Sequence, residues 1–294
     1  MKIGLFAVGT PKMAGGSLLK ALAVNAERLG VATLWVPEHV VLIDKYVSKY
    51  PYTQDGHLPA STNAPIFDPF VALTAIAAVT STIRLATGIC LVPEHNPLVL
   101  AKVVATLDFL SGGRAVLGAG IGWLEEEFHA IGVPWERRAQ RTRDYIDALR
   151  KLWGADLSSH QGEFVRFEGV RSYPKPIKGA KLPIFFGGES GPALRRVAEY
   201  GDGWVGFNLT PDEAAAKIKR IEDLLRANGR NRSEIELAVS PYTKPITQDD
   251  LKRYRDAGVD EVVLIKLRPP RAEDEMVKDM EQIARDWIDP AAKL

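Results

Sequence analysis

The sequence predicts an α/β protein, a (β/α)8 TIM barrel, and three observations lead to that fold class. Short, almost wholly apolar runs alternate with longer segments of helical periodicity, as expected for parallel strands buried on both faces. About eight such strand–helix units follow one another, which closes a barrel, whereas an open doubly wound sheet usually has about six strands. A barrel of 294 residues is ordinarily one domain, so we expect a single domain over residues 1–294.

The first four units are marked by helix-capping signals as well as by periodicity. Ser17 stands where an N-cap is needed and Gly30 where a helix should stop, while Pro97 falls in the first turn of a later helix. The expected strands and helices are, in order, Ile3–Val8, Ser17–Leu29, Thr33–Pro37, Pro69–Val79, Ile83–Val92, Pro97–Leu110, Ala115–Ile121 and Glu136–Trp153.

The last four units have shorter connections. Gly201 closes one helix directly before the next strand. The expected strands and helices are Leu182–Gly187, Gly191–Tyr200, Gly203–Phe207, Pro211–Asn228, Ile235–Ser240, Thr247–Ala257, Glu261–Leu267 and Arg271–Trp287.

Two connections are long enough to count as insertions. Glu38–Asp68 follows strand 2, so a barrel places it at the catalytic face, where Tyr46, Tyr50, Tyr52 and Phe67 suggest either an aromatic lid or simple packing. Gly154–Lys181 precedes strand 5 and contains one short strand-like piece, Phe164–Phe167. Because it follows a helix, its base lies at the opposite face, and it would have to wrap around the barrel to reach the site.

Composition excludes several classes of function. The 38 basic and 37 acidic residues leave a net charge of +1, which favours neither nucleic acid nor a membrane surface as a partner. No apolar stretch reaches the length of a membrane helix, and the first residues lack a signal-peptide pattern. With Cys90 as the one cysteine, no intramolecular disulfide can form. We therefore expect a cytoplasmic protein.

Candidate chemistry begins where strands 2 and 3 end. Glu38 and His39 follow strand 2, and an adjacent acid and imidazole can exchange protons near neutral pH, although a solvated loop end has the same sequence. In strand 3, Gly88 marks either a bulge or a packing contact. Cys90 is interpreted as a buried small residue rather than a nucleophile, and His95 as a turn residue within reach of the mouth.

The end of strand 4 is rich in glycine. Gly118 and Gly120 resemble a dinucleotide fingerprint, but Trp123 occupies the place of its third glycine, so that interpretation fails. The glycines are better explained by the close approach of a ring or of backbone. Trp123 is a candidate for stacking on such a ring.

The strongest local signal follows strand 5, where Gly187, Gly188, Glu189 and Ser190 lead into a helix. Free N–H groups at a helix start bind phosphate, and Ser190 either caps the helix or contacts the anion. The charge of Glu189 opposes a phosphate unless the side chain points away.

Metal-site and hydrolase motifs are missing from the sequence. The five histidines are scattered, so their spacing predicts no metal, and neither a P-loop nor a G-x-S-x-G motif occurs.

Several of these segments together resemble the bacterial luciferase-like flavin monooxygenase superfamily. The resemblance covers nearly the whole chain in order. The segments that carry it are Asn96–Lys102, Ala105–Arg114, Gly118–Trp123, Tyr173–Pro176, Leu182–Ile184, Gly187–Gly188 and Ala198–Trp204.

Within that superfamily, Gly118–Phe128 and the Tyr- and Pro-rich loop after strand 2 are most similar to the branch that uses the deazaflavin coenzyme F420. The resemblance implies an insertion before strand 5 and a non-prolyl cis peptide at Gly88–Ile89, facing the cofactor. It also implies that His39, beside Glu38, handles protons during hydride transfer. The sugar-phosphate dehydrogenases of the family carry a catalytic Glu where this chain has Ile121, which argues against their reaction.

The resemblance thus implies an F420-dependent oxidoreductase that moves a hydride to or from a small organic substrate, as a homodimer. The alternatives are a monooxygenase that uses reduced FMN and dioxygen, and a flavin-binding protein without turnover. The candidate catalytic residues are His39 and Glu38. The candidate cofactor-binding residues are Thr87, Gly88, Ile89, Gly118, Gly120, Trp123, Gly187, Gly188, Glu189 and Ser190.

Overall fold

The structure, a computed structural model, describes residues 1–6, 16–265 and 272–294. Eight strand positions form a closed parallel barrel, in which β1 pairs with both β2 and β11, and β3 pairs with β5. The strands are β1 (Lys2–Leu5), β2 (Thr33–Val36), β3 (Arg84–Thr87), β5 (Ala115–Gly120), β8 (Ile184–Gly187), β9 (Gly203–Phe207), β10 (Glu236–Ser240) and β11 (Glu261–Leu264). The predicted (β/α)8 barrel is confirmed.

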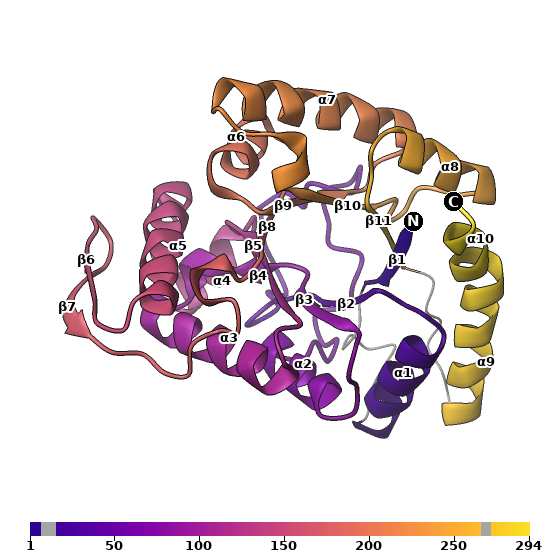
Figure 1. Cartoon of the computed structure of the whole chain (residues 1–294), viewed down its shortest axis with the longest axis horizontal. Helices are drawn as coiled ribbons and strands as arrows, with labels where there is room; N and C mark the ends of the chain where they lie inside the picture. Colours follow the sequence, from indigo (N-terminus) through magenta and orange to yellow (C-terminus); the bar gives the residue numbers. More distant parts are fainter. Residues whose placement is uncertain (7–15, 266–271) are drawn as a thin grey trace.

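A ring of helices surrounds the strands (Figure 1). They are α1 (Gly16–Arg28), α2 (Pro69–Ala77), α3 (Pro97–Ser111), α5 (Arg138–Gly154), α6 (Gly191–Tyr200), α7 (Pro211–Ala227), α8 (Gln248–Asp256), α9 (Glu273–Ile283) and α10 (Asp289–Ala292), the last two joined by a π-helical turn. Side-chain caps fix many helix starts: Asn96 caps α3, and Thr210 and Thr247 form capping boxes on α7 and α8.

Three predicted elements differ from the structure. Strand 3 was expected to run unbroken over Ile83–Val92, but it splits into β3 and β4 (Cys90–Leu91), because a bulge at Gly88–Ile89 shifts the pairing with β5 by one residue. The helix expected from Glu136 begins at Arg138, and a short helix, α4 (Glu125–Ala130), precedes it.

The insertion before β8 also differs, because it forms a two-stranded antiparallel hairpin and not one short strand. Its strands are β6 (Ser158–Gln161) and β7 (Arg166–Val170), and the hairpin lies outside the helix ring beside α5 (Figure 1). The parts of the first strand, the last strand and the last helix that were expected within residues 7–15 and 266–271 lie outside the described residues.

The buried core has two layers. The larger one lies between the strands and the helices. The smaller one fills the barrel, and each of seven strands contributes one side chain to it: Trp35, Ala86, Val116, Phe185, Val205, Ala238 and Val263, with Phe6 packed against them. The barrel interior is therefore solid, and any site must lie at one of its ends.

A layer of paired charges closes the amino end of the barrel. Glu261 is fully buried inside it and accepts hydrogen bonds from Thr33 and from Trp35, both at 3.0 Å. Gly4 leaves room for this carboxylate, since a Cβ there would lie 2.1 Å from Glu261 Oε1. Arg84 lies 3.9 Å from the same carboxylate.

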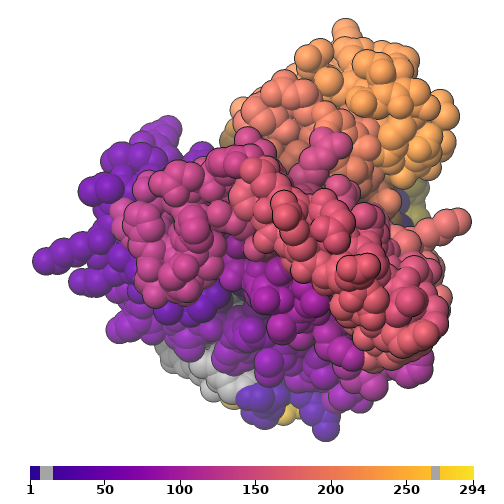
Figure 2. Space-filling model, turned by 90° about the vertical axis from the view of Figure 1, so that its left-hand side faces the viewer, coloured from indigo at the N-terminus to yellow at the C-terminus, as the bar shows by residue number. Residues whose placement is uncertain are grey.

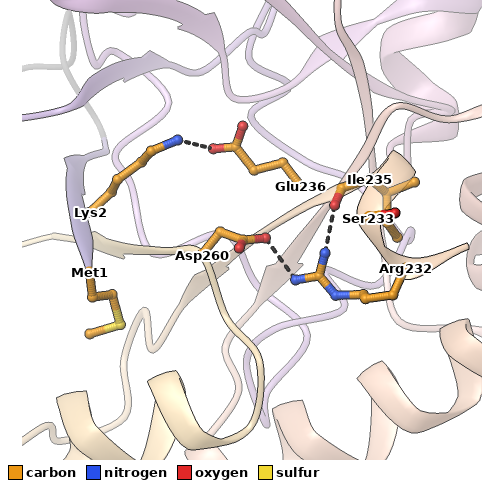
Figure 3. A pocket seen from close by; sticks show the side chains of 7 residues that line it. All are labelled: Met1, Lys2, Arg232, Ser233, Ile235, Glu236 and Asp260. Carbon is orange, nitrogen blue, oxygen red and sulfur yellow. Dashed lines mark hydrogen bonds and ion pairs between the residues drawn. The ribbon is translucent and has the colours of Figure 1, made fainter. Parts of the chain in front are cut away.

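A pocket of about 630 Å3 opens at this amino end and is shown in Figure 3. Its charged side chains point toward one another. Lys2 pairs with Glu236 at 3.0 Å, and Arg232 pairs with Asp260 at 2.8 Å. Because these charges satisfy each other at the end of the barrel that stabilises the fold, we assign this pocket no ligand.

In the part of the chain that the structure describes, no helix is long and apolar enough to cross a membrane. Figure 2 shows the side that carries α5 and the hairpin, while the insertion after β2, coloured indigo to purple, projects at one edge. The hairpin is tied to α5, where Asp144 bonds to His160 and to the backbone of Phe164. These contacts hold the second insertion on the flank of the barrel.

Candidate active site

His39, directly after β2, is held at the carboxyl end of the barrel by a buried acid. Its Nδ1 lies 2.7 Å from Glu127 Oε2, and Glu127 on α4 is completely buried. The other oxygen of Glu127 accepts the backbone N–H groups of Val40 and Val41, at 2.7 and 3.2 Å. The imidazole therefore has a fixed orientation and presents its Nε2 edge away from Glu127.

Glu38 does not partner His39, although the two are adjacent in sequence. Its buried carboxylate accepts the Leu91 N–H at 2.5 Å and contacts His95 Nε2 at 3.0 Å. Burial opposes a charge on His95, but the hydrogen bond and the charge of Glu38 prevail and raise its pKa. The structure thus separates the predicted pair into two acid–imidazole pairs, His39–Glu127 and Glu38–His95.

Glu38, Cys90 and His95 also lie close enough to consider a metal, since their ligating atoms are within 4.8 Å of one another. Burial, followed by the charge of Glu38, raises the pKa of the Cys90 thiol. A thiol that keeps its proton is a poor ligand, and the Glu38 oxygens are already engaged. We interpret the three as a hydrogen-bonded support beneath the mouth and assign no metal to them.

The strand-3 bulge follows the carboxyl end of β3, and its Gly88–Ile89 peptide bond is cis, as the resemblance implied. The neighbouring glycines make room for it. A Cβ on Gly118 would lie 2.0 Å from the Thr87 carbonyl oxygen, and one on Gly120 would lie 2.3 Å from Ile89 Cδ1. The Thr87 hydroxyl donates to the Gly118 carbonyl at 2.8 Å. Close approach of backbone, one of the two explanations for these glycines, is what the structure contains.

Aromatic side chains from the first insertion cover part of the mouth. Trp123 makes edge contacts with His39, Tyr46 and Tyr50, at centroid distances of 6.1, 5.7 and 5.1 Å. Tyr52 packs against Phe207, the last residue of β9, with ring centroids 4.9 Å apart. The tyrosines therefore pack the insertion onto the barrel, which was the simpler of the two expectations, and they wall the side of the mouth next to His39.

The turn after β8 begins with Gly188, whose φ of +105° favours glycine. Ser190 caps α6, since its side chain accepts from the Ala193 N–H at 3.3 Å. Glu189 turns toward β9, where it accepts the Phe207 N–H at 2.7 Å. Burial raises the pKa of Glu189, even though Phe207 and the Tyr52 hydroxyl donate to it. The sequence suggested that the charge of Glu189 opposes a phosphate at this turn. That argument is weaker in the structure, because the Glu189 carboxyl faces β9 and burial disfavours its charge.

One acid at the mouth has no hydrogen-bond partner among the described residues. Both carboxyl oxygens of Glu94, at the end of the 3-10 turn Val92–Glu94, are buried without a hydrogen bond. Burial, and then the charges of Glu127 and Glu38, raises the pKa of Glu94 to about 9. A strongly shifted side-chain pKa, such as that of Glu94, is common at functional sites.

The sequence pointed to His39 but missed its partner. Glu127 stands third in the run Glu125–Glu126–Glu127, and only the turn of α4 decides which of these acids is buried. Glu94 was passed over because the Pro-Glu-His-Asn-Pro segment has the composition of a plain turn. Proline-bounded acids directly after a barrel strand are the available signal for such a residue.

Together, the closed parallel barrel, two acid–imidazole pairs at its carboxyl end and a capped glycine turn before α6 define a (β/α)8 barrel with titratable groups at its mouth. The chain matches the luciferase-like monooxygenase family over residues 1–287 and belongs to that family. Membership makes it an enzyme of the luciferase-like oxidoreductase and monooxygenase group.

Similar proteins include both characterised and uncharacterised ones. A Mycobacterium tuberculosis protein described as uncharacterised is 36% identical over 267 residues, which span 90% of this chain and 92% of that protein. The 5,10-methylenetetrahydromethanopterin reductase of Methanolobus tindarius is 28% identical over 226 residues, 77% of this chain and 65% of the reductase.

Solved structures agree on the fold. The coenzyme F420-dependent tetrahydromethanopterin reductase from Methanopyrus kandleri superimposes with a TM-score of 0.76 at 17% identity, covering 98% of each chain. The monooxygenase RslO1 from Streptomyces bottropensis superimposes with a TM-score of 0.75 at 21% identity, covering 98% of this chain and 99% of that one.

Proposed function

We propose that the protein is an F420-dependent oxidoreductase that transfers a hydride between the deazaflavin and a small organic substrate. The observation that carries the proposal is His39, oriented at the barrel mouth by the fully buried Glu127 and walled on one side by Trp123. Similarity to a 5,10-methylenetetrahydromethanopterin reductase over 77% of this chain, and a fold shared with a coenzyme F420-dependent tetrahydromethanopterin reductase, support F420 over FMN. When bound, the deazaflavin supplies or accepts a hydride, and the protein supplies the proton.

The residues at the mouth suit a flat cofactor with an anionic tail. Gly118, Gly120 and the bulge Thr87–Ile89 provide a backbone platform, and we assign to it the central ring. Gly187 and Gly188 continue that platform into the turn before α6. Trp123 forms the wall beside His39.

The start of α6 fits the anionic part. Arg195 Nη1 lies 3.7 Å from the position that a Cβ on Gly191 would take, so a guanidinium stands beside the helix N-terminus. Arg195 and Arg196 line a groove between α5 and α6 together with Glu199, and neither arginine makes a hydrogen bond or an ion pair among the described residues. Unpaired guanidinium groups next to a helix start are suited to phosphate or carboxylate groups.

His39 is the residue that we propose to touch the reacting atoms. Glu127 holds the imidazole in one orientation, so the nitrogen at its other edge can donate a proton to the reduced substrate or accept one from it. Glu38 takes no direct part. It ties the loop after β2 to β4 through the Leu91 N–H.

The first experiment is a titration of the purified protein with F420 and with FMN, followed by cofactor fluorescence. Micromolar or tighter binding of F420 with weak FMN binding supports the proposal and justifies a substrate screen. Preference for FMN, with oxygen consumption, would instead support the monooxygenase alternative.

Arg195→Ala should weaken F420 binding about tenfold, which corresponds to about 1.4 kcal/mol. Arg226→Ala, on the exposed surface of α7, is the matched control.

His39→Ala separates an enzyme from a binding protein. With a substrate identified by the screen, it should lower kcat about 100-fold or more while F420 binding changes little. A variant that changes affinity alone would favour a flavin-binding protein without turnover.

We also propose a homodimer in the cytoplasm. Val71 on α2 and Val99 and Leu110 on α3 are between 60% and 70% exposed, and residues eleven apart on one helix share a face. A second copy covering this apolar face would remove it from water. Sedimentation of the wild type and of Leu110→Lys tests the dimer. Cys90, buried and unpaired, suits a reducing compartment.

A further inference from the structure

The groove between α5 and α6 lies at the rim of the mouth. The two helices are neighbours in the ring (Figure 1), and both begin at the carboxyl end of the barrel, because they follow the barrel strands β5 and β8. Its polar and charged lining consists of Gln140 and Arg143 on α5 and of Arg195, Arg196, Glu199 and Tyr200 on α6. Its volume is about 180 Å3, below the roughly 300 Å3 at which sites for small molecules begin. The groove therefore suits one part of a ligand whose remainder binds elsewhere.

The groove carries an excess of positive charge. Three guanidinium groups line it, against the single carboxylate of Glu199. That carboxylate pairs with Arg143 at 2.9 Å, whereas Arg195 and Arg196 make no hydrogen bond or ion pair among the described residues. Arginine keeps its charge over the whole physiological pH range, so two cations are left uncompensated. A bound anion would compensate them.

The two unpaired arginines occupy different parts of the groove. Arg195 reaches back to the start of α6, where its Nη1 lies 3.7 Å from the position of a Cβ on Gly191. Arg196 is partly buried, and burial lowers its pKa, while Tyr200 and Glu199 on the following turn of α6 act in the opposite direction. Arg195 thus stands beside the helix start, and Arg196 stands further along the groove as a partly desolvated cation.

The starts of both helices add to the attraction for an anion. Arg137, the N-cap of α5, has a φ of 57° and makes no side-chain cap hydrogen bond, so the first N–H groups of α5 lack the usual side-chain acceptor. On α6, the Ser190 side chain accepts from the Ala193 N–H. The dipoles of the two helices favour negative charge at the same end of the groove.

We propose that the α5–α6 groove binds the tail of F420 and thereby distinguishes F420 from FMN. Both cofactors have a flat ring system and a phosphate, but only F420 continues beyond the phosphate into a chain of carboxylates. The inference rests on the proposed function, in which the phosphate lies at the start of α6 beside Arg195. From there the carboxylates follow the groove toward Arg196 and Arg143.

Fluorescence titration with three probes tests the groove: F420, F420 cut back to its phosphate, and FMN. The wild type should bind F420 about tenfold more tightly than the shortened cofactor. Arg196→Met keeps the apolar stem but removes the charge, so F420 affinity should fall about tenfold while affinity for the shortened cofactor stays within about twofold. Arg195→Ala should weaken the binding of both, because Arg195 stands beside the phosphate.

Glu199→Gln should give a response of the opposite sign. It removes the negative charge of the groove and frees Arg143, so F420 should bind about threefold more tightly, with no gain for the shortened cofactor or for FMN. Raising the salt concentration should reduce that gain, since the groove is open to solvent. Arg226→Met, an exposed arginine on α7, is the matched control and should change none of these affinities.

Two results would overturn the tail site: equal affinity of the wild type for F420 and the shortened cofactor, or equal losses for the two in Arg196→Met. The proposed function would still stand if F420 remained preferred to FMN. A wild type that prefers FMN would instead sink the proposed function and the tail site together. Urea unfolding checks each variant, and if Arg196→Met fails to fold, Arg143→Met at an exposed position should weaken F420 alone.

Discussion

At the amino end of the barrel, the acids around the pocket have Lys or Arg partners: Glu236 accepts from Lys2 and Arg84, and Asp260 from Arg232 (Figure 3). At the mouth, the acids face imidazoles and backbone N–H groups, and Glu94 faces no donor among the described residues. Lysine and arginine keep their charge over the physiological range, whereas imidazoles and an uncompensated acid change theirs.

This difference in partners leads to opposite responses to pH. Although burial opposes it, Arg84 and then Lys2 lower the pKa of Glu236, so its contribution to stability is present above pH 4.5 and is lost in acid. The raised pKa values of Glu94 and His95 move the sensitivity of the mouth to higher pH. One end is thus suited to holding the fold together and the other to exchanging protons.

The largest effect on stability is expected from Gly4→Ala at the amino end. The added Cβ would lie 2.1 Å from Glu261 Oε1 and 3.0 Å from Trp35 Nε1, so the buried carboxylate must shift from its donors. We expect a loss of about 3 kcal/mol, measured by urea unfolding. Gly120→Ala at the mouth meets only the end of Ile89 and should weaken F420 binding more than stability. Equal stability losses in the two variants would break the comparison.

Glu127→Gln should have the second largest effect, and on turnover rather than on folding. The amide keeps the shape of the side chain but removes the charge that holds His39. We expect kcat to fall about 100-fold, measured in steady state with the substrate from the screen. Unfolding in urea serves as the control, since a drop in stability as large as that of Gly4→Ala would make Glu127 a structural residue.

Glu236→Gln tests whether the amino end of the barrel loses stability in acid, in contrast to the mouth. The variant should be about 1 kcal/mol less stable than the wild type at neutral pH, because its pairs with Arg84 and Lys2 are partly exposed to solvent. Its stability should also depend less on pH below 4.5, the side on which the ionised acid stops contributing. Thermal unfolding over a series of acidic buffers measures both. A variant that keeps the wild-type loss of stability in acid would contradict the assignment of this loss to Glu236.

Ser190→Ala is expected to have the smallest effect. Removing the cap of α6 should cost about 1 kcal/mol of stability, with a change in F420 affinity of less than tenfold, because the Ser190 side chain is already engaged by the Ala193 N–H. Thermal melting and the fluorescence titration measure the two quantities. A much larger loss of affinity at unchanged stability would mean that Ser190 binds the anion directly.

The sequence by itself determined the barrel, because apolar strand periodicity, glycine stops and capping residues act locally and agree with one another. It also pointed to the strand ends that carry His39, Gly88 and Ser190. The position of the cis peptide followed from resemblance to a family. Local patterns of this kind need no knowledge of distant contacts.

Tertiary structure alone decided the partners. His39 and Glu127 are 88 residues apart, and Glu38 and His95 are 57 apart, so no spacing rule connects them. Burial likewise separates Glu127 from the two acids beside it, and Glu94 has no hydrogen-bond donor in the part of the chain that the structure describes. Which acid is neutral and which holds an imidazole depends on desolvation and neighbouring charge, and both exist only once the barrel has closed.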